Sequence, residues 1–129
     1  MKIVKTDSAP AAIGPYSQAV IMENLMFSSG QIPLCPQTME IVGDDVTAQT
    51  EQVMQNISAI LKKSSCKFTD VLKTTCFLTD MNDFAAFNAV YEKYFNGFNK
   101  PARSCVAVAA LPKGVLVEVE VIARVGVLW

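Results

Sequence analysis

Two runs near the end of the chain alternate apolar residues with others and predict two β-strands. In residues 115–125 every second position is apolar, which is the pattern of a strand with one buried face. The positions in between are Leu116, Glu118, Glu120, Ile122 and Arg124. In residues 101–110 one face consists of Arg103, Cys105, Ala107 and Ala109. The turn at 111–114 would allow the two runs to pair as a hairpin, but their register stays open.

Shorter runs of β-branched and aromatic residues predict further strands. These cover residues 2–6, 17–22, 25–29 and 71–78. Residues 17–22 and 25–29 would form a hairpin, and residues 71–78 would form a central strand. Residues 8–15 contain two prolines and a glycine, which predict a loop that ends at Tyr16. Ser29 and Gly30 close the hairpin. A glycine here would let another group approach the backbone, although an ordinary turn would also explain it.

Apolar residues at helical spacing predict two helices. The first begins after Asp44 and Asp45, which suit the cap and the helix dipole, and ends within residues 62–65. We expect Asn82 to cap the second helix, which ends near Gly97.

Asn88 falls on the edge of the apolar arc of the second helix, beside Phe84 and Phe95. A buried amide needs a hydrogen-bond partner. A ligand could supply that partner, and so could the backbone or water.

The order of these elements predicts an α+β fold in one domain, residues 1–129. Both helices would pack on one face of a mixed sheet. The other face would be left bare, and we expect its valines to be buried in an oligomer. The apolar composition agrees, because 51% of the residues are hydrophobic and 18% are charged.

Charge and composition narrow the chemistry. A net charge of −1 gives no electrostatic basis for binding nucleic acid or an anionic membrane. The chain has no histidine, which excludes histidine-based catalysis and histidine-ligated zinc, and its four cysteines form no CxxC pair, so no metal site is expected. Four reduced thiols and the lack of a leader or membrane-spanning run predict a cytoplasmic protein.

Arg103, Glu118 and Glu120 carry the most chemical information. A guanidinium is a planar fork of donors that suits a carboxylate. A glutamate in an apolar strand can have its pKa raised by desolvation, which suits proton transfer near neutral pH. The three residues would then serve a small carboxylate substrate and an acid/base step. They could equally be solvated or paired charges on a half-exposed sheet, and the pattern does not separate Glu118 from Glu120.

Several blocks along the chain resemble the RidA/YjgF family of enamine and imine deaminases. They are APAAIGPYSQAV, FSSGQIP, AQTEQVMQNI, VLKTTCFLTDMNDFAAFNAVY and PARSCVAVAALPKG followed by VEVE. The resemblance implies a chorismate-mutase-like fold whose final strand lies between earlier strands, so that no terminal hairpin forms. It also implies a homotrimer with a central barrel of sheets and sites in the clefts between subunits.

The same resemblance implies an activity and its residues. Members hydrolyse 2-imino acids, such as 2-iminobutanoate and 2-iminopropanoate, to 2-keto acids and ammonia without a cofactor. Arg103 would bind the substrate carboxylate and Glu118 would position or activate water. The pocket would further be lined by Tyr16, Ser29, Gly30, Asn88 and the backbone of Cys105. Cys105 as a nucleophile is a weak alternative, because no base is present to form its thiolate.

Three departures from the family pattern lie outside these motifs. Met39 stands where many members carry glycine, Ser64 and Ser65 stand where the first helix often ends in Ala-Gly, and the segment before residue 101 is shorter. They could change the pocket rim. Two other functions stay open: a regulator that binds 2-keto acids without turnover, and a chaperone or ribonuclease-like role.

Overall fold

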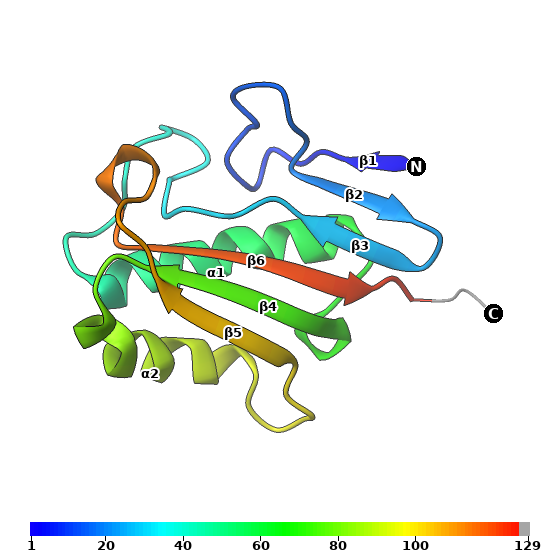
Figure 1. Ribbon diagram of the computed structural model, residues 1–129. Helices are drawn as coiled ribbons and strands as arrows, with labels where there is room; N and C mark the ends of the chain where they lie inside the picture. Colours follow the sequence, from blue (N-terminus) through cyan, green and yellow to red (C-terminus); the bar gives the residue numbers. More distant parts are fainter. Residues whose placement is uncertain (127–129) are drawn as a thin grey trace.

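The computed structural model describes residues 1–126, which form a mixed six-stranded sheet and two α-helices (Figure 1). The strands are β1 (Lys2–Val4), β2 (Ala19–Met22), β3 (Leu25–Ser28), β4 (Val71–Leu78), β5 (Ala102–Ala107) and β6 (Val117–Arg124). The helices are α1 (Val46–Lys63) and α2 (Phe84–Tyr94). Both helices lie on one face of the sheet, so the predicted α+β class is confirmed. The end of the predicted domain, residues 127–129, lies outside the described residues.

The final strand β6 lies inside the sheet, in the order β1-β2-β3-β6-β4-β5. It runs antiparallel to β3 and to β4, whereas β5 pairs in parallel with β4 at the edge. The hairpin that the two terminal runs could have formed is therefore absent, as the family resemblance implied. The short connection at Pro112–Gly114 instead carries the chain across β4. This crossing separates Arg103 on β5 from Glu118 on β6 by one strand.

The apolar face of β6 forms the centre of the core. Val117, Val119 and Ala123 are 0% exposed. The core residues of the helices are Val46, Val53, Met54, Ile57, Ile60, Leu61, Phe87 and Tyr91. We expected the valines to lie on the bare face of the sheet, and this was wrong. Residues alternate between the two faces of a strand, and the unbroken apolar set is the one turned toward the helices.

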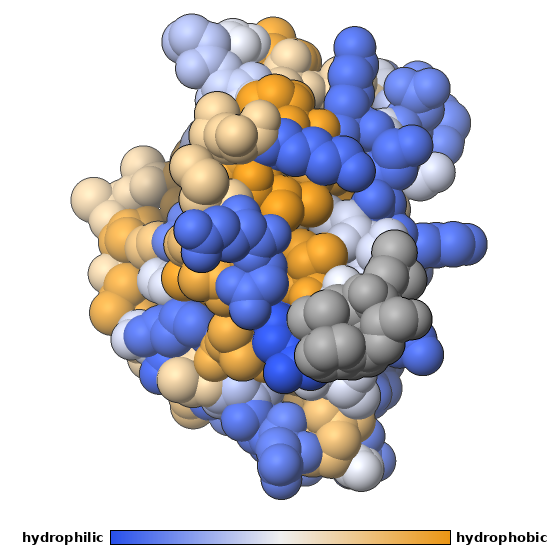
Figure 2. Space-filling view, turned by 90° about the vertical axis from the view of Figure 1, so that its right-hand side faces the viewer, coloured by the Kyte–Doolittle hydropathy of each residue, from blue (hydrophilic) through white to orange (hydrophobic). Residues whose placement is uncertain are grey.

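The face without helices carries Glu118 and Glu120, together with apolar residues of the neighbouring strands. Phe27 of β3 is 39% exposed and Val106 of β5 is 46% exposed. The register places Phe27 beside Ile122 and Phe77 beside Glu118, so all of them share this face. Figure 2 views a different side, the end of the sheet where the C-terminus lies in Figure 1, and there too apolar groups in orange lie between hydrophilic groups in blue.

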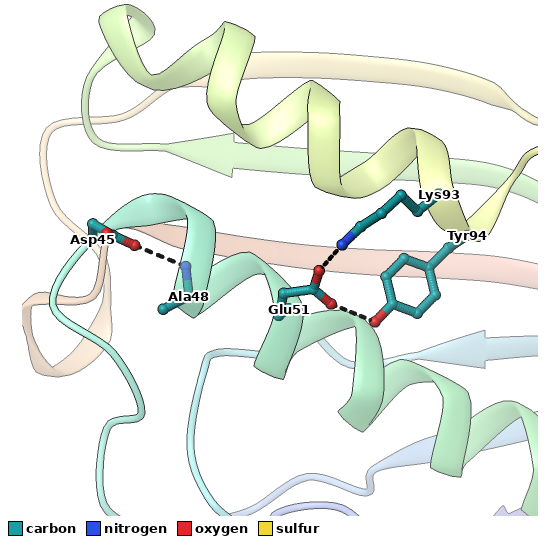
Figure 3. A network of polar contacts seen from close by, with 5 residues as sticks. All are labelled: Asp45, Ala48, Glu51, Lys93 and Tyr94. Atoms are coloured by element: carbon teal, nitrogen blue, oxygen red, sulfur yellow. Dashed lines mark hydrogen bonds and ion pairs between the residues drawn. The ribbon is translucent and has the colours of Figure 1, made fainter.

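The ends of α1 follow from side-chain and backbone capping. Asp45 is the N-cap, as expected, and its Oδ1 accepts a hydrogen bond of 2.8 Å from the Ala48 N–H (Figure 3). At the other end Ser65 has a φ of 59°, and the Cys66 N–H donates to the Leu61 carbonyl at 2.8 Å. This is the left-handed helix stop that glycine usually forms. Serine at this position keeps the geometry but strains the backbone.

The start of α2 differs from the prediction. Asn82 is not the N-cap, because it lies within a short 3-10 turn, Met81–Asp83, that precedes the helix. The Asn82 N–H donates instead to Asp80 Oδ1 at 2.9 Å, so Asp80 caps the turn. The two residues are both good caps, and the sequence does not show which one the extra turn uses.

One polar network ties the two helices together. Glu51 of α1 pairs with Lys93 of α2 and accepts a hydrogen bond of 2.7 Å from the Tyr94 hydroxyl (Figure 3). The Lys93 bond, followed by the Tyr94 bond, lowers the pKa of Glu51. The C-terminal end of α2 is thereby held against α1. Within residues 1–126 neither helix is long and apolar enough to span a membrane.

Candidate functional site

Arg103 extends from β5 beneath α2, where three side chains fix its guanidinium. Its Nη1 donates a hydrogen bond of 2.6 Å to Asn88 Oδ1. The guanidinium carbon lies 4.8 Å from the centre of the Tyr91 ring and 5.5 Å from that of Phe84. Stacking on aromatic faces and the amide bond hold the planar group in one orientation. The partner of the Asn88 amide oxygen is therefore Arg103 rather than backbone.

Tyr91 and Thr74 form the layer below Arg103. The Tyr91 hydroxyl lies 2.8 Å from Thr74 Oγ1, and both residues are buried. Thr74 of β4 pairs in register with Arg103 of β5. Sequence reasoning did not connect Tyr91 with the site. The spacing of Asn88 and Tyr91, three residues apart on one helix, was the available signal, whereas no signal pointed to Thr74.

A pocket of about 350 Å³ opens beside this cluster. Its lining residues are Asn88, Tyr91, Glu92, Phe95, Lys100, Pro101 and Arg103. The Lys100 ammonium donates a hydrogen bond of 2.8 Å to the Phe95 carbonyl just past the end of α2. A small anion in the pocket would thus meet one oriented guanidinium, with a second cation at the rim.

Cys105 lies two residues after Arg103 on the same face of β5 and packs against the core. Burial raises the pKa of Cys105. Burial also raises the pKa of Cys66 to about 11 and of Cys76 to about 12. These three thiols are protonated at neutral pH, which does not favour a cysteine nucleophile. Within residues 1–126 no group of three histidine, cysteine or acidic residues is placed to hold a metal ion.

Glu118 lies on the opposite face of the sheet, against the backbone of Gly30. A Cβ atom on Gly30 would lie 2.1 Å from Glu118 Oε2, so no larger residue fits while the carboxylate stays in place. The glycine therefore does admit another group, as one of the two readings of the sequence expected. Gln31, the next residue, forms a bridge with Val119 of β6 and fixes the approach.

The environment of Glu118 favours its neutral form. Burial, followed by repulsion from Glu120, raises the pKa of Glu118. A carboxyl group with a raised pKa can exchange a proton closer to neutral pH than an ordinary glutamate. The two acidic residues that the sequence did not distinguish thus differ in the structure, because Glu118 lies against Gly30 and Glu120 lies beside Lys73 and Thr75.

Tyr16 and Ser29 lie on the Glu118 side of the molecule. Tyr16 is 53% exposed and lines a pocket of about 390 Å³ together with Gly30, Gln31 and Lys113. The Ser29 hydroxyl donates a hydrogen bond of 2.6 Å to the Ser17 carbonyl. Its proton is therefore used to hold the loop that precedes β2, and only its lone pairs remain for a ligand.

The predicted site residues form two groups on opposite faces of one sheet. Arg103, Asn88 and Cys105 lie on the helix face, whereas Glu118, Gly30 and Tyr16 lie on the other side. Strand alternation causes this separation, because Arg103 is in register with Thr74 of β4 while Glu118 is in register with Phe77. One chain thus presents an arginine half and an acidic half, which face different directions.

Known proteins match this chain along nearly its whole length. The family model described as Endoribonuclease L-PSP matches residues 6–125. The 2-iminobutanoate/2-iminopropanoate deaminase of Escherichia coli is 50% identical over 124 residues, which cover 95% of this chain and 96% of that protein. A protein of Lactococcus lactis named as a candidate regulator, AldR, is 59% identical over 125 residues, which cover 97% of this chain and 98% of its own.

A solved structure agrees with the sequence matches. The crystal structure of E. coli TdcF with bound serine superposes with a TM-score of 0.92 at 47% identity, covering 96% of this chain and 98% of TdcF. The fold and the two half-sites, one around Arg103 and one around Glu118, define a small α+β protein with an arginine pocket. The chain belongs to the RidA/YjgF family, as its sequence blocks predicted.

Proposed function

We propose that the protein hydrolyses reactive 2-imino acids, such as 2-iminobutanoate and 2-iminopropanoate, to 2-keto acids and ammonia. The observation that carries this proposal is the pair of half-sites. Arg103 is an oriented guanidinium beside a pocket of about 350 Å³, and Glu118 is a half-buried carboxyl group with a raised pKa. The first binds a carboxylate and the second moves a proton. The name of the E. coli relative supports the same reaction.

The reaction needs only these groups. Arg103 binds the substrate carboxylate and places the C=N carbon within reach of a water molecule. The Glu118 carboxylate takes a proton from the water molecule while the water oxygen attacks the carbon of the protonated imine. This gives a tetrahedral amino alcohol. Glu118 then gives that proton to the nitrogen. The C–N bond breaks as the hydroxyl oxygen forms the C=O bond and releases its proton to the Glu118 carboxylate or to the departing ammonia, which leaves together with the keto acid. A protonated imine is already electrophilic, so neither a cofactor nor a metal is required.

The two half-sites meet between copies of the chain in this proposal. Arg103 and Glu118 face opposite sides of one sheet, so a substrate that contacts both needs Glu118 from a neighbouring copy. The uncovered sheet face carries the exposed Phe27 and Val106, which association would bury. A cyclic homotrimer, with these faces forming a central barrel, repeats the same heterologous contact around the ring. Tyr16 and Ser29 would then complete the acidic side.

The remaining expectations follow from the same site. The partner is a small 2-imino or 2-keto acid, and serine bound to TdcF shows that a related structure accepts a small amino acid. Nucleic acid is not expected as a partner despite the endoribonuclease name of the family model, because the net charge is −1 and no histidine is present for RNA cleavage. We place the protein in the cytoplasm, where its four free cysteines would stay reduced.

A second candidate is a regulator that binds 2-keto acids without turnover. It is favoured by the naming of the Lactococcus relative and needs only the Arg103 half of the site. The close fit of Glu118 on Gly30 favours the enzyme, because a sensor has no use for a carboxyl group with a raised pKa.

The test is keto-acid and ammonia release from 2-iminobutanoate generated in situ by a threonine dehydratase, corrected for spontaneous hydrolysis. We expect acceleration by the wild type and none by Arg103→Ala, with Lys63→Ala, at the exposed end of α1, as a control cation that retains turnover. An Arg103→Ala variant as active as the wild type would show that Arg103 does not bind the substrate carboxylate. Keto-acid binding without any acceleration would favour the regulator.

A further inference from the structure

Cys76 and Cys105 lie side by side on neighbouring strands. β4 and β5 run parallel, and their register pairs Cys76 directly with Cys105. Both side chains point to the helix face, since they alternate in step with Thr74 and Arg103. Cys76 is 0% exposed, whereas Cys105 is only partly covered, so the pair is reachable from the Cys105 side.

The spacing of two neighbouring strands suits a bridging ion. Adjacent strands are about 4.8 Å apart. A thiolate–metal bond is about 2.3 Å, so a linear sulfur–metal–sulfur unit spans about 4.6 Å. Two thiols are also enough for an ion that prefers two soft ligands, such as Cu(I).

The surrounding charges favour such an ion. When Cu(I) replaces the protons of both thiols, two protons leave to solvent and the bis-thiolate complex carries a net charge of −1. Arg103 lies two residues from Cys105 on the same face and supplies the compensating positive charge. The Thr74 hydroxyl lies 3.9 Å from the Cys76 sulfur and adds a polar neighbour.

We propose that Cys76 and Cys105 form a two-coordinate site for a soft metal ion, with Cu(I) as its probe, and that its occupation closes the Arg103 pocket to carboxylates. The binding part stands on the strand register alone, whereas the closure rests on the proposed function of Arg103. The negative complex holds the guanidinium that a substrate would otherwise use. The other two cysteines have no thiol partner in register: Cys35 lies in a loop, and Cys66 contacts backbone carbonyls.

Competition for Cu(I) with a chromophoric chelator, on the reduced full-length protein without oxygen, tests the binding. We expect one tightly held Cu(I) per chain in the wild type and in Cys35→Ser. Cys76→Val and Cys105→Ser should weaken binding by more than about 100-fold, because one thiolate cannot replace two. Cys76→Val keeps an apolar side chain of similar size in the core. Unchanged affinity in these two variants, or loss in Cys35→Ser, would overturn the site.

A second measurement uses the wild type and needs no variant to fold. Cu(I) should protect Cys105 from alkylation by iodoacetamide and leave Cys35 labelled at its usual rate, and equal labelling of Cys105 with and without Cu(I) would contradict the proposal. In a third arm, one equivalent of Cu(I) should abolish keto-acid binding in the wild type but not in Cys76→Val. If Cu(I) binds and keto acid still binds, the metal site stands and the closure is wrong. If no keto acid binds without Cu(I), the proposed function fails and the metal site is unaffected.

Discussion

Replacing Gly30 with alanine should displace the Glu118 carboxyl group while the stability of the fold stays nearly the same. The new Cβ would lie 2.1 Å from Glu118 Oε2 and 2.7 Å from the carboxyl carbon. To reach the ordinary contact of 3.4 Å, the nearer oxygen must retreat by about 1.3 Å, and a misplacement of about 1 Å costs roughly 100-fold in rate. We therefore expect kcat/KM to fall about 100-fold, or about 2.7 kcal/mol in transition-state stabilisation.

The fold should tolerate this change. Gly30 does not have a positive φ, and the atoms in its way belong to the far end of a flexible side chain. We expect the free energy of unfolding to stay within about 1 kcal/mol of the wild type. Gly126→Ala is a matched control, because its Cβ would meet only the Ser65 carbonyl at 3.8 Å and should change neither property.

The assay is keto-acid release from 2-iminobutanoate, with urea unfolding measured on the same samples. A Gly30→Ala variant with wild-type kcat/KM would refute the reasoning, since Glu118 would then act from a position that alanine blocks. A loss of activity that only follows a loss of stability would also count against it. A rescue variant gives a further test. The shorter side chain of Glu118→Asp leaves room for the alanine Cβ, so this change in the Gly30→Ala background should recover part of the rate.

Four further predictions concern other residues. Glu118→Gln should abolish turnover while Glu120→Gln keeps it, and a dead Glu120→Gln beside an active Glu118→Gln would reverse the assignment. Because burial raises the pKa of Glu118, its ionisation costs stability. Glu118→Gln should therefore leave stability unchanged below the ordinary glutamate pKa, stabilise the protein increasingly as the pH rises through the raised pKa, and give its full effect above it, as urea unfolding at several pH values will show. Ser65→Gly relieves a φ of 59° and should stabilise by about 1 kcal/mol in thermal unfolding, and a loss of stability would contradict the strained helix stop. Asp80→Ala should cost about 1 kcal/mol and Asn82→Ala almost nothing, and the reverse order would restore Asn82 as the cap.

The sequence predicted the elements well because each has a local cause. Alternation in 115–125, helical spacing after Asp45 and the prolines of 8–15 act over a few residues, and the structure confirms all three. The failures are non-local. Which face of β6 meets the helices depends on the packing of α1 and α2, and the choice of Asp80 over Asn82 depends on one extra turn.

The candidate site was only half visible in the sequence. Side-chain chemistry singles out Arg103, Glu118 and Glu120, and the helix edge and the strand end single out Asn88 and Gly30. Only the family resemblance chooses Glu118 over Glu120. The strand order, with β4 between β5 and β6, was needed to show that Arg103 and Glu118 point to opposite faces. Long-range pairing sets that order, and no local pattern encodes it. Tyr91 was missed for the same reason, because its role depends on the strand that passes beneath it.

The central claim is that one active site takes Arg103 from one copy of the chain and Glu118 from another. Mixing Arg103→Ala with Glu118→Gln tests it, with the two chains unfolded together, refolded in equal amounts and assayed for keto-acid release. Each variant alone, treated in the same way, should be inactive. In a ring of randomly mixed chains about a quarter of the sites combine an intact arginine with an intact glutamate, so we expect about a quarter of the wild-type activity. A mixture as inactive as its parents would contradict the shared site.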